Sequence, residues 1–194
     1  NSCNCAFGAI ALELGADTLA EYAEKLGFTQ ELSLDGITIP AGKFDKAGEG
    51  SIGLAWSGIG QYNDLVVPYA LVRYVSAVAN GGSVYEPTLL GHGSLDRETE
   101  LLGSDTAARI AEMMNYNVQN AYGGQWTFPG LNVSAKTGTA EVGDGTSHAW
   151  MTGFLNDANH PYAFVVLVEN AGGGLTNAGP IANTLLQAAV AADA

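Results

Sequence analysis

Basic residues are scarce in this chain of 194 residues. Seven Lys and Arg stand against twenty Asp and Glu, which gives a formal net charge of −13. Nucleic acids bind to basic protein surfaces, because Lys and Arg neutralise their phosphates, so the composition argues against a nucleic-acid partner. The same charge argues against direct adsorption to anionic membranes.

Long apolar segments are also lacking. A transmembrane helix needs about 20 consecutive apolar residues, and no segment of this sequence approaches that length. The first residues do not have the pattern of a signal peptide. Apolar residues nevertheless make up 47% of the chain, which is enough for one sizeable core. The sequence therefore predicts one globular domain, with the possibility of two lobes.

Cysteine is limited to Cys3 and Cys5, which are too close in sequence for an ordinary disulfide. They form no metal-binding pattern with the histidines, so we expect two free, buried thiols and no metal. Residues 48–53 match the glycine pattern of dinucleotide-binding loops. No strand leads into this segment and no long helix clearly follows it, so no cofactor is expected.

Helical periodicity dominates the first two thirds of the chain. Residues 4–26 predict two consecutive helices that are interrupted at Gly15. Thr18 and Glu21 have the spacing of a capping box, which predicts the start of the second helix. Residues 28–67 are rich in glycine, and we expect a long irregular connection with brief helical or extended pieces.

Two longer helices are expected after this connection. The first begins at Pro68, a favoured residue at the first helical position, and extends to about Asn80. The second is expected to be capped by Ser104 or Asp105. Its inward face is predicted from apolar residues at helical spacing, namely Ala107, Ile110, Ala111, Met114 and Val118.

From Tyr122 the pattern changes to short strands and tight turns. A strand at 133–141, a hairpin turn at 143–145 and strands at 148–155 and 162–169 predict an antiparallel sheet. A last helix beginning near Pro180 is expected to pack on the sheet through its apolar side chains Ile181, Leu185 and Ala189. The predicted fold class is α+β: a mainly helical lobe over residues 1–121, followed over residues 122–194 by sheet strands and a closing helix.

Lys136 lies within the first of these strands, in otherwise small or apolar company. Thr137 and Thr139 offer hydroxyl groups beside it, and Gly138 permits a close approach of another backbone. An extended ligand could lie along this strand, with its carboxylate held by charge-assisted hydrogen bonds. Taken alone, the motif favours the simpler interpretation that the lysine is an edge-strand residue that discourages aggregation.

Other motifs, in a fixed order, give this strand a context. Ser2-Cys-Asn4 precedes Lys136-Thr-Gly-Thr139, and both motifs resemble those of serine acyltransferases that act on D-Ala-D-Ala peptides and β-lactams. Residues 58–61 (Gly-Ile-Gly-Gln), 68–87 and 148–154 (His-Ala-Trp-Met-Thr-Gly-Phe) also resemble segments of these proteins. Over essentially its whole length, the chain is similar to the transpeptidase domain of penicillin-binding proteins.

The resemblance implies a role for each motif residue. Ser2 would relay a proton, and Asn4 would hold the amide group of the substrate. Lys136 would tune the charge of the site and help to bind the terminal carboxylate. Thr137 and Thr139 would offer hydroxyls to that carboxylate on either side of Gly138, and the backbone N–H of Thr139 would complete an oxyanion hole. The structural alternative is that Ser2 and Asn4 only cap the first helix.

One element of the family pattern is missing. In the family a Ser-x-x-Lys serine is the nucleophile, but no serine in this chain is followed by a lysine three residues later. We therefore expect the chain to be the C-terminal part of a transpeptidase domain, to depend on the missing N-terminal part of that domain, and to be inactive alone. Apolar surface left open in this way predicts self-association.

Several alternative functions share some of these features. A β-lactamase or a β-lactam sensor domain has the same motifs, and a D,D-carboxypeptidase differs only in using water as the acyl acceptor. A non-enzymatic interaction domain is consistent with the absent nucleophile. A Ser-His-Asp hydrolase is disfavoured, because no Gly-x-Ser-x-Gly segment occurs. The resemblance further implies an extracytoplasmic location, with the parent protein anchored by an N-terminal membrane helix outside this sequence.

Overall fold

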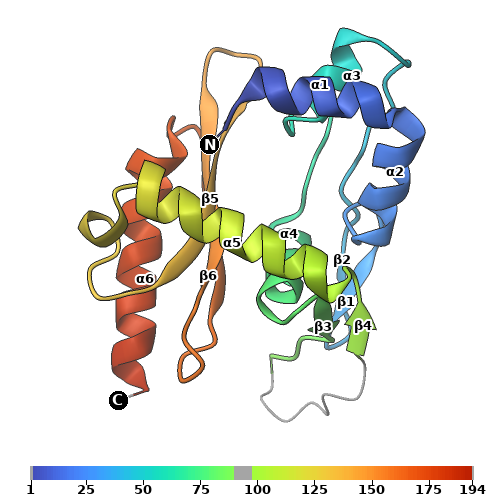
Figure 1. The fold of residues 1–194 in the computed structure, drawn as a ribbon. Coiled ribbons are helices and arrows are strands. Elements are labelled where there is room, and N and C mark those ends of the chain that lie inside the picture. The colour runs from blue at the N-terminus through green and yellow to red at the C-terminus, as the bar shows by residue number, and fades with distance from the viewer. Residues whose placement is uncertain (1, 90–97, 194) are drawn as a thin grey trace. The chain divides into compact units, whose positions relative to one another are not determined.

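The structure is a computed structural model that describes residues 2–89 and 98–193. Helices predominate in the first part of the chain, and the three-stranded sheet lies in the second part (Figure 1). This is an α+β architecture, as predicted. The elements are α1 (Asn4–Leu14), α2 (Ala16–Lys25), β1 (Leu32–Leu34), β2 (Ile37–Ile39), α3 (Ile52–Ser57), α4 (Pro68–Ala79), β3 (Ser83–Tyr85), β4 (Glu98–Glu100), α5 (Ser104–Ala121), the 3₁₀ turn η1 (Gly124–Trp126), β5 (Val133–Glu141), β6 (Ser147–Leu155), β7 (Ala163–Val168), the π-turn η2 (Gly174–Ala178) and α6 (Gly179–Ala192).

The described residues form two compact units. Those within 1–71 and 85–98 make the first unit, and those within 72–84 and 99–194 make the second. The division falls within α4. Helix α5, which was grouped with the helical lobe in the prediction, packs on the sheet and is part of the second unit.

In the first unit, helix α2 begins where a distant carboxylate meets its N-terminus. Oε1 of Glu49 accepts a hydrogen bond from the backbone N–H of Ala16 at 2.9 Å. Gly15, at φ +84°, makes the sharp turn from α1 into α2. The predicted capping box at Thr18 is wrong, because the helix already starts two residues earlier with a cap that comes from another part of the chain.

The sheet of the second unit is the expected antiparallel meander, with the order β5-β6-β7. Its register pairs Lys136 with Thr152 and Gly138 with Trp150. Strand β5 covers the predicted residues, and β6 and β7 differ from the prediction by one residue at their ends. Because β5 is the first strand in this order, it is an edge strand of the sheet.

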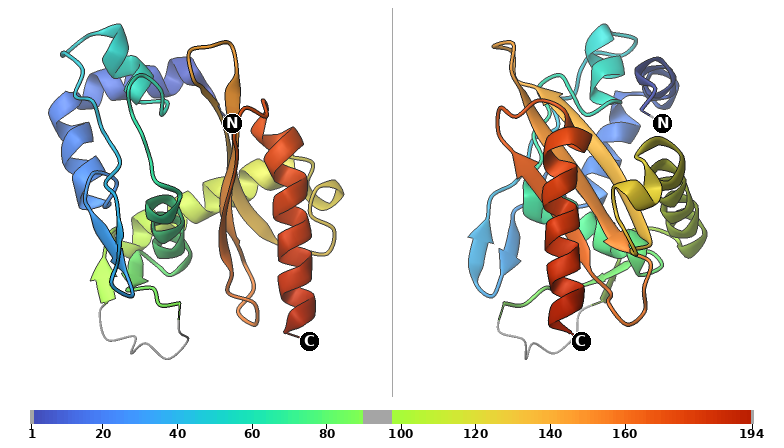
Figure 2. Two further views of the ribbon diagram at one scale, coloured as in Figure 1. Left: turned by 180° about the vertical axis from the view of Figure 1, so that it is seen from behind. Right: turned by 90° about the vertical axis from the view of Figure 1, so that its left-hand side faces the viewer.

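Helices lie on both faces of the sheet (Figure 2). Helix α6 covers the face that carries Val133, Ala135 and Met151, and its residues Ala182 and Leu186 belong to the same buried cluster. Helix α5 meets the other face, where the hydroxyl of Ser134 donates to the carbonyl of Ala111 at 3.2 Å. The predicted packing of the closing helix on the sheet is confirmed.

The predicted inward face of α6 is wrong by one position. Ile181 and Leu185 are exposed, while Ala182 and Leu186 are buried. In contrast, Ala107, Met114 and Val118 of α5 are buried, as the helical spacing predicted. The apolar residues of α6 surround most of the helix, so helical spacing alone could not choose the buried side.

Other expectations also need correction. Cys3 and Cys5 are exposed rather than buried, because they lie at the start of α1, whose buried positions are Gly8 and Ala11. The residue that caps α5 is Gly103, not Ser104 or Asp105. The two-stranded sheets β1-β2 and β3-β4 were not predicted as such, because strands of three residues leave too little periodicity to detect.

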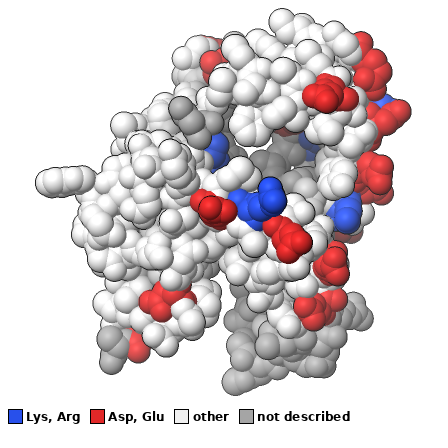
Figure 3. All heavy atoms as spheres, viewed as in Figure 1, with Lys and Arg blue, Asp and Glu red and all other residues white. Residues whose placement is uncertain are grey.

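Charged side chains on the face shown in Figure 3 are mostly acidic and are separated by uncharged areas. This distribution agrees with the excess of twenty Asp and Glu over seven Lys and Arg. Within residues 2–89 and 98–193, no helix is long and apolar enough to cross a membrane.

Candidate active site

The orientation of the β5 backbone follows from its hydrogen bonds to β6. The N–H of Asn156 donates to the carbonyl of Asn132 at 2.8 Å, just before the paired segment. Backbone groups alternate along an antiparallel strand, so even-numbered residues of β5 direct their N–H and C=O toward β6. Odd-numbered residues, including Thr137 and Thr139, direct theirs toward the outer edge of the sheet. An extended ligand that pairs with β5 would meet this edge.

Lys136 is half-buried on the sheet face that it shares with Trp150 and Thr152. Its Nζ donates a hydrogen bond to the carbonyl oxygen of Thr137 at 2.6 Å. That carbonyl points to the outer edge, so the ammonium group is folded over the edge of the strand. A positive charge therefore lies where an extended ligand would end or pass.

The two threonine hydroxyls lie on the opposite face of β5 from Lys136, because side chains alternate along a strand. The Thr137 hydroxyl donates to the hydroxyl oxygen of Tyr122 at 3.2 Å. Thr139 Oγ1 accepts a hydrogen bond from the N–H of Gly174, at 3.3 Å. The lysine and both hydroxyls can act on one ligand only if that ligand lies along the edge between the two faces.

Gly138 is packed from both sides. A Cβ atom at this position would lie 3.1 Å from Cβ of Trp150, and Gly174 lies against the backbone of Gly138 on the other face. The backbone groups of Gly138 face β6 rather than the outer edge. The glycine is therefore explained by internal packing, and its expected part in ligand approach stays a prediction.

Ser2 and Asn4 belong to the first unit. Ser2 is exposed and precedes α1, and Asn4 is the exposed first residue of that helix. The N-cap residue is Cys3, whose side chain makes no capping hydrogen bond. The structure thus brings together Lys136, Thr137, Gly138 and Thr139 on one strand, whereas the approach of Ser2 to Lys136 stays a prediction.

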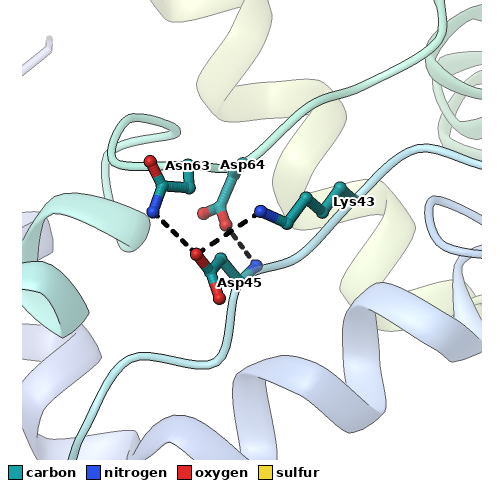
Figure 4. Close-up of polar contacts among 4 residues, drawn as sticks. All are labelled: Lys43, Asp45, Asn63 and Asp64. Atoms are coloured by element: carbon teal, nitrogen blue, oxygen red, sulfur yellow. Dashed lines mark hydrogen bonds and ion pairs between the residues drawn. The ribbon is translucent and has the colours of Figure 1, made fainter.

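A second polar cluster, in the first unit, consists of Lys43, Asp45, Asn63 and Asp64 (Figure 4). The Asn63 amide donates to Asp45 Oδ2 at 2.7 Å, and the N–H of Asp45 donates to Asp64 Oδ1 at 2.9 Å. The amide of Asn63 holds the pKa of Asp45 below its ordinary value, and burial raises that of Asp64. These bonds join two loop segments, so the cluster has a structural explanation.

Metal ligands do not gather in this structure: among residues 2–89 and 98–193, no three His, Cys, Asp or Glu side chains lie together as metal ligands would. The candidate site on β5 consists of an ammonium group, hydroxyls and backbone groups. Such a set can bind a carboxylate and stabilise negative charge on an oxygen.

A comparison with protein families identifies the family of this chain. A family model described as penicillin binding protein transpeptidase domain matches residues 1–187. The chain belongs to the penicillin-binding protein transpeptidase family. The resemblance inferred from the Ser-x-Asn and Lys-Thr-Gly motifs is confirmed.

Curated relatives of this transpeptidase-family chain match most of its length. It is 26% identical to the peptidoglycan D,D-transpeptidase PbpA of Mycobacterium tuberculosis, over 97% of this chain and 42% of that protein. It is 30% identical to the peptidoglycan D,D-transpeptidase MrdA of Haemophilus influenzae, over 66% of this chain and 24% of that protein. The chain thus spans less than half the length of these relatives.

Solved structures of the family have the same fold. The D,D-transpeptidase domain of a peptidoglycan glycosyltransferase from Eggerthella lenta superposes with a TM-score of 0.83 at 24% identity, over 98% of this chain and 51% of that chain. Penicillin-binding protein A of M. tuberculosis, in a ceftriaxone acyl-enzyme complex, has a TM-score of 0.83 at 27% identity, over 97% of this chain and 46% of that chain. The predicted α+β transpeptidase-like fold is confirmed.

Tyr122 and Gly174 contact the candidate site, but the sequence did not single them out. Tyr122 follows the end of α5, and Gly174 begins η2, a π-turn that the spacing of residues 172–180 does not predict. No short motif contains either residue together with Lys136. The only available signal was the run of glycines at 172–174, which indicates a close backbone approach without naming its partner.

Proposed function

We propose that the full-length protein containing this chain is a peptidoglycan D,D-transpeptidase that acts outside the cytoplasmic membrane. Its substrate would be the D-Ala-D-Ala end of a stem peptide, and β-lactams would acylate the same site. The observation that carries this proposal is the position of Lys136 on an edge strand, beside outward-facing backbone groups. The family membership supports the reaction class.

The reaction would pass through an acyl-enzyme. A serine hydroxyl from outside these 194 residues would attack the carbonyl carbon of the penultimate D-Ala. The bond to the terminal D-Ala nitrogen would then break, and the serine proton would pass to that nitrogen through Ser2. An amine of a second stem peptide would then attack the ester carbonyl carbon. The bond to the serine oxygen would break, the amine proton would pass to that oxygen, and the new amide bond would be the cross-link.

The residues of this chain would bind and stabilise rather than attack. The amide of Asn4 would hold the peptide group of the donor, and Lys136 with Thr139 would bind the terminal carboxylate. The outward N–H of Thr139 would donate to the developing oxyanion. Electrostatic stabilisation of this charge is usually the largest single contribution to the rate in reactions of this type. Thr137 is less suited to bind the carboxylate directly, because its hydroxyl hydrogen is directed at Tyr122.

The test is an assay of the full-length protein with a peptide that ends in D-Ala-D-Ala and an added amine acceptor. Release of free D-Ala together with formation of the amine-linked product, both blocked by penicillin, is the expected result. Release of D-Ala without a linked product would instead indicate a D,D-carboxypeptidase. Rapid turnover of penicillin itself would indicate a β-lactamase. If the protein neither releases D-Ala nor turns over penicillin, an enzymatic function is contradicted.

A further inference from the structure

Side chains occupy part of the outer edge of β5. The amide of Asn115, on α5, donates to the outward carbonyl of Val133 at 3.0 Å. Four residues along the strand, the outward N–H of Thr137 donates to the hydroxyl oxygen of Tyr122 at 3.3 Å. The outward carbonyl of Thr137 accepts from Lys136 at 2.6 Å. The edge is therefore closed at Val133 and at Thr137.

Tyr122 is held firmly in this position. It is only 8% exposed, and its ring belongs to the buried cluster of the sheet and α6. Its N–H donates to the carbonyl of Asn117 at 3.0 Å, and its carbonyl accepts from the hydroxyl of Thr127. Because backbone and ring are both fixed, the hydroxyl of Tyr122 cannot swing away from the edge without disturbing the core.

A ligand that pairs with β5 as an added strand would need outward backbone groups that are open to it. Side chains already use both outward groups of Thr137, and one of these side chains carries a positive charge. A ligand chain that continued past Thr137 would have to displace the hydroxyl of Tyr122 and the ammonium of Lys136. A chain that stops there would instead present its terminal carboxylate to that ammonium.

We propose that Tyr122 is a specificity-determining residue that ends the ligand-binding edge of β5 at Thr137. It thereby restricts acyl donors to chains whose last residue bears a free carboxylate at this point. This inference rests on the proposed transpeptidase function and adds a residue that limits the length of the donor chain. Lys136 attracts the carboxylate, and Tyr122 excludes a further residue.

The experiment compares two thioester donors in the full-length protein that contains this chain. One is an acyl-D-alanyl thioglycolate, whose leaving group ends in a carboxylate. The other carries glycine in amide linkage on that leaving group, so its chain is one residue longer. Release of free thiol gives kcat/KM for each donor, and the ratio of the two values measures the preference for the shorter chain.

Tyr122→Leu removes both the hydroxyl and the outer part of the ring, and Tyr122→Phe removes only the hydroxyl. We expect the preference for the shorter donor to fall by about tenfold in Tyr122→Leu, because a backbone donor becomes open to the extra residue. A smaller fall is expected in Tyr122→Phe. Tyr116→Leu, at an exposed tyrosine on α5, is the matched control and should keep the wild-type ratio.

A merely structural role for Tyr122 would lower kcat/KM for both donors together and leave their ratio unchanged. An unchanged ratio in the folded variants therefore overturns the proposal. If Tyr122→Leu does not fold, the ratio in Tyr122→Phe decides in the same way. Failure of the proposed function is a different result, namely no thiol release by the wild-type protein from either donor.

Discussion

Gly174 lies directly against Gly138, such that a Cβ atom on Gly174 would come within 2.4 Å of the carbonyl oxygen of Gly138. The same atom would meet the carbonyl oxygen of Trp150 at 2.4 Å. Both partners are backbone atoms of paired strands, so neither can move as a flexible side chain could. The turn before α6 is thereby fixed on the strand that carries Lys136.

This contact predicts a large effect of a small substitution. Gly174→Ala should lower the free energy of unfolding by about 1–3 kcal/mol, as overpacking does in other cores, and should displace β5 or η2. Urea denaturation measures the stability, and amide hydrogen exchange of residues 136–139 measures the displacement. Gly48→Ala is the matched control, because nothing lies within 4 Å of a Cβ at that position. Equal stability of the two variants would contradict the contact.

A second prediction concerns the start of α2. Glu49→Ala removes the acceptor for the N–H of Ala16 and should cost about 1 kcal/mol of stability, as the loss of a helix cap does. Thr18→Ala should cost less, because the helix begins before Thr18. Urea denaturation of both variants tests this order. A larger loss for Thr18→Ala would favour the capping box that the sequence suggested.

A third prediction concerns Asp64. Burial of its carboxyl group raises its pKa above the ordinary value of 3.8. The folded state then binds more protons than the unfolded state just above that pH, so stability falls as the pH rises through the raised pKa. Asp64→Asn keeps an oxygen to accept from Asp45 but removes the titration. Urea denaturation between about pH 4 and pH 7 should show the wild type losing stability relative to the variant.

Asp64→Asn should have a flatter stability profile than the wild type over this pH range, because it lacks the raised titration of Asp64. If the wild type instead gained stability relative to Asp64→Asn as the pH rose, the hydrogen bond from Asp45 would outweigh the cost of burial. That result would reverse the sign assigned to Asp64.

A fourth prediction concerns the other edge of the sheet. The N–H of Leu155 donates to the carbonyl of Tyr162 at 2.9 Å, so by alternation the backbone of Val165 in β7 points away from β6. Apolar edge strands promote association between chains. We predict that the 194-residue chain alone self-associates, and that Val165→Lys reduces this association.

Sedimentation velocity of the chain and its variants measures this effect. Val142→Lys, at an exposed position after β5, adds the same charge away from β7 and should leave the association unchanged. A monomeric wild-type chain would contradict the prediction. Equal loss of association in both variants would indicate a general effect of charge rather than pairing at the β7 edge.

Much of the architecture could be predicted where a periodic pattern was long. Strand β5 was predicted at its observed bounds, and the strands that follow it were predicted within one residue, because runs of small or apolar residues bounded by turn residues are typical of strands. The cap of α2 could not be predicted, because Glu49 lies 33 residues from Ala16. The residues next to Ala16 in the sequence do not indicate such a distant contact.

The candidate site was predicted in part for the same reason. Lys136, Thr137, Gly138 and Thr139 are consecutive, so one motif identified them together. Tyr122 meets Thr137 across 15 residues, through the end of a helix and a turn whose geometry no motif describes. The two faces of β5 were implied by strand alternation, but the use of the Thr137 hydroxyl by Tyr122 depends on the packing of α5 and the sheet.

We propose that Lys136 and Asn4 serve an acyl-transfer site of a penicillin-binding protein. The most direct measurement is the rate of covalent labelling by fluorescent penicillin. We predict that the full-length protein is labelled, that Lys136→Ala and Asn4→Ala each slow the labelling roughly a hundredfold or more, and that Lys25→Ala does not. The 194-residue chain alone should not be labelled, because no serine in it is followed by a lysine three residues later. An unlabelled full-length protein, or a stable penicilloyl adduct on Ser2, would contradict the account.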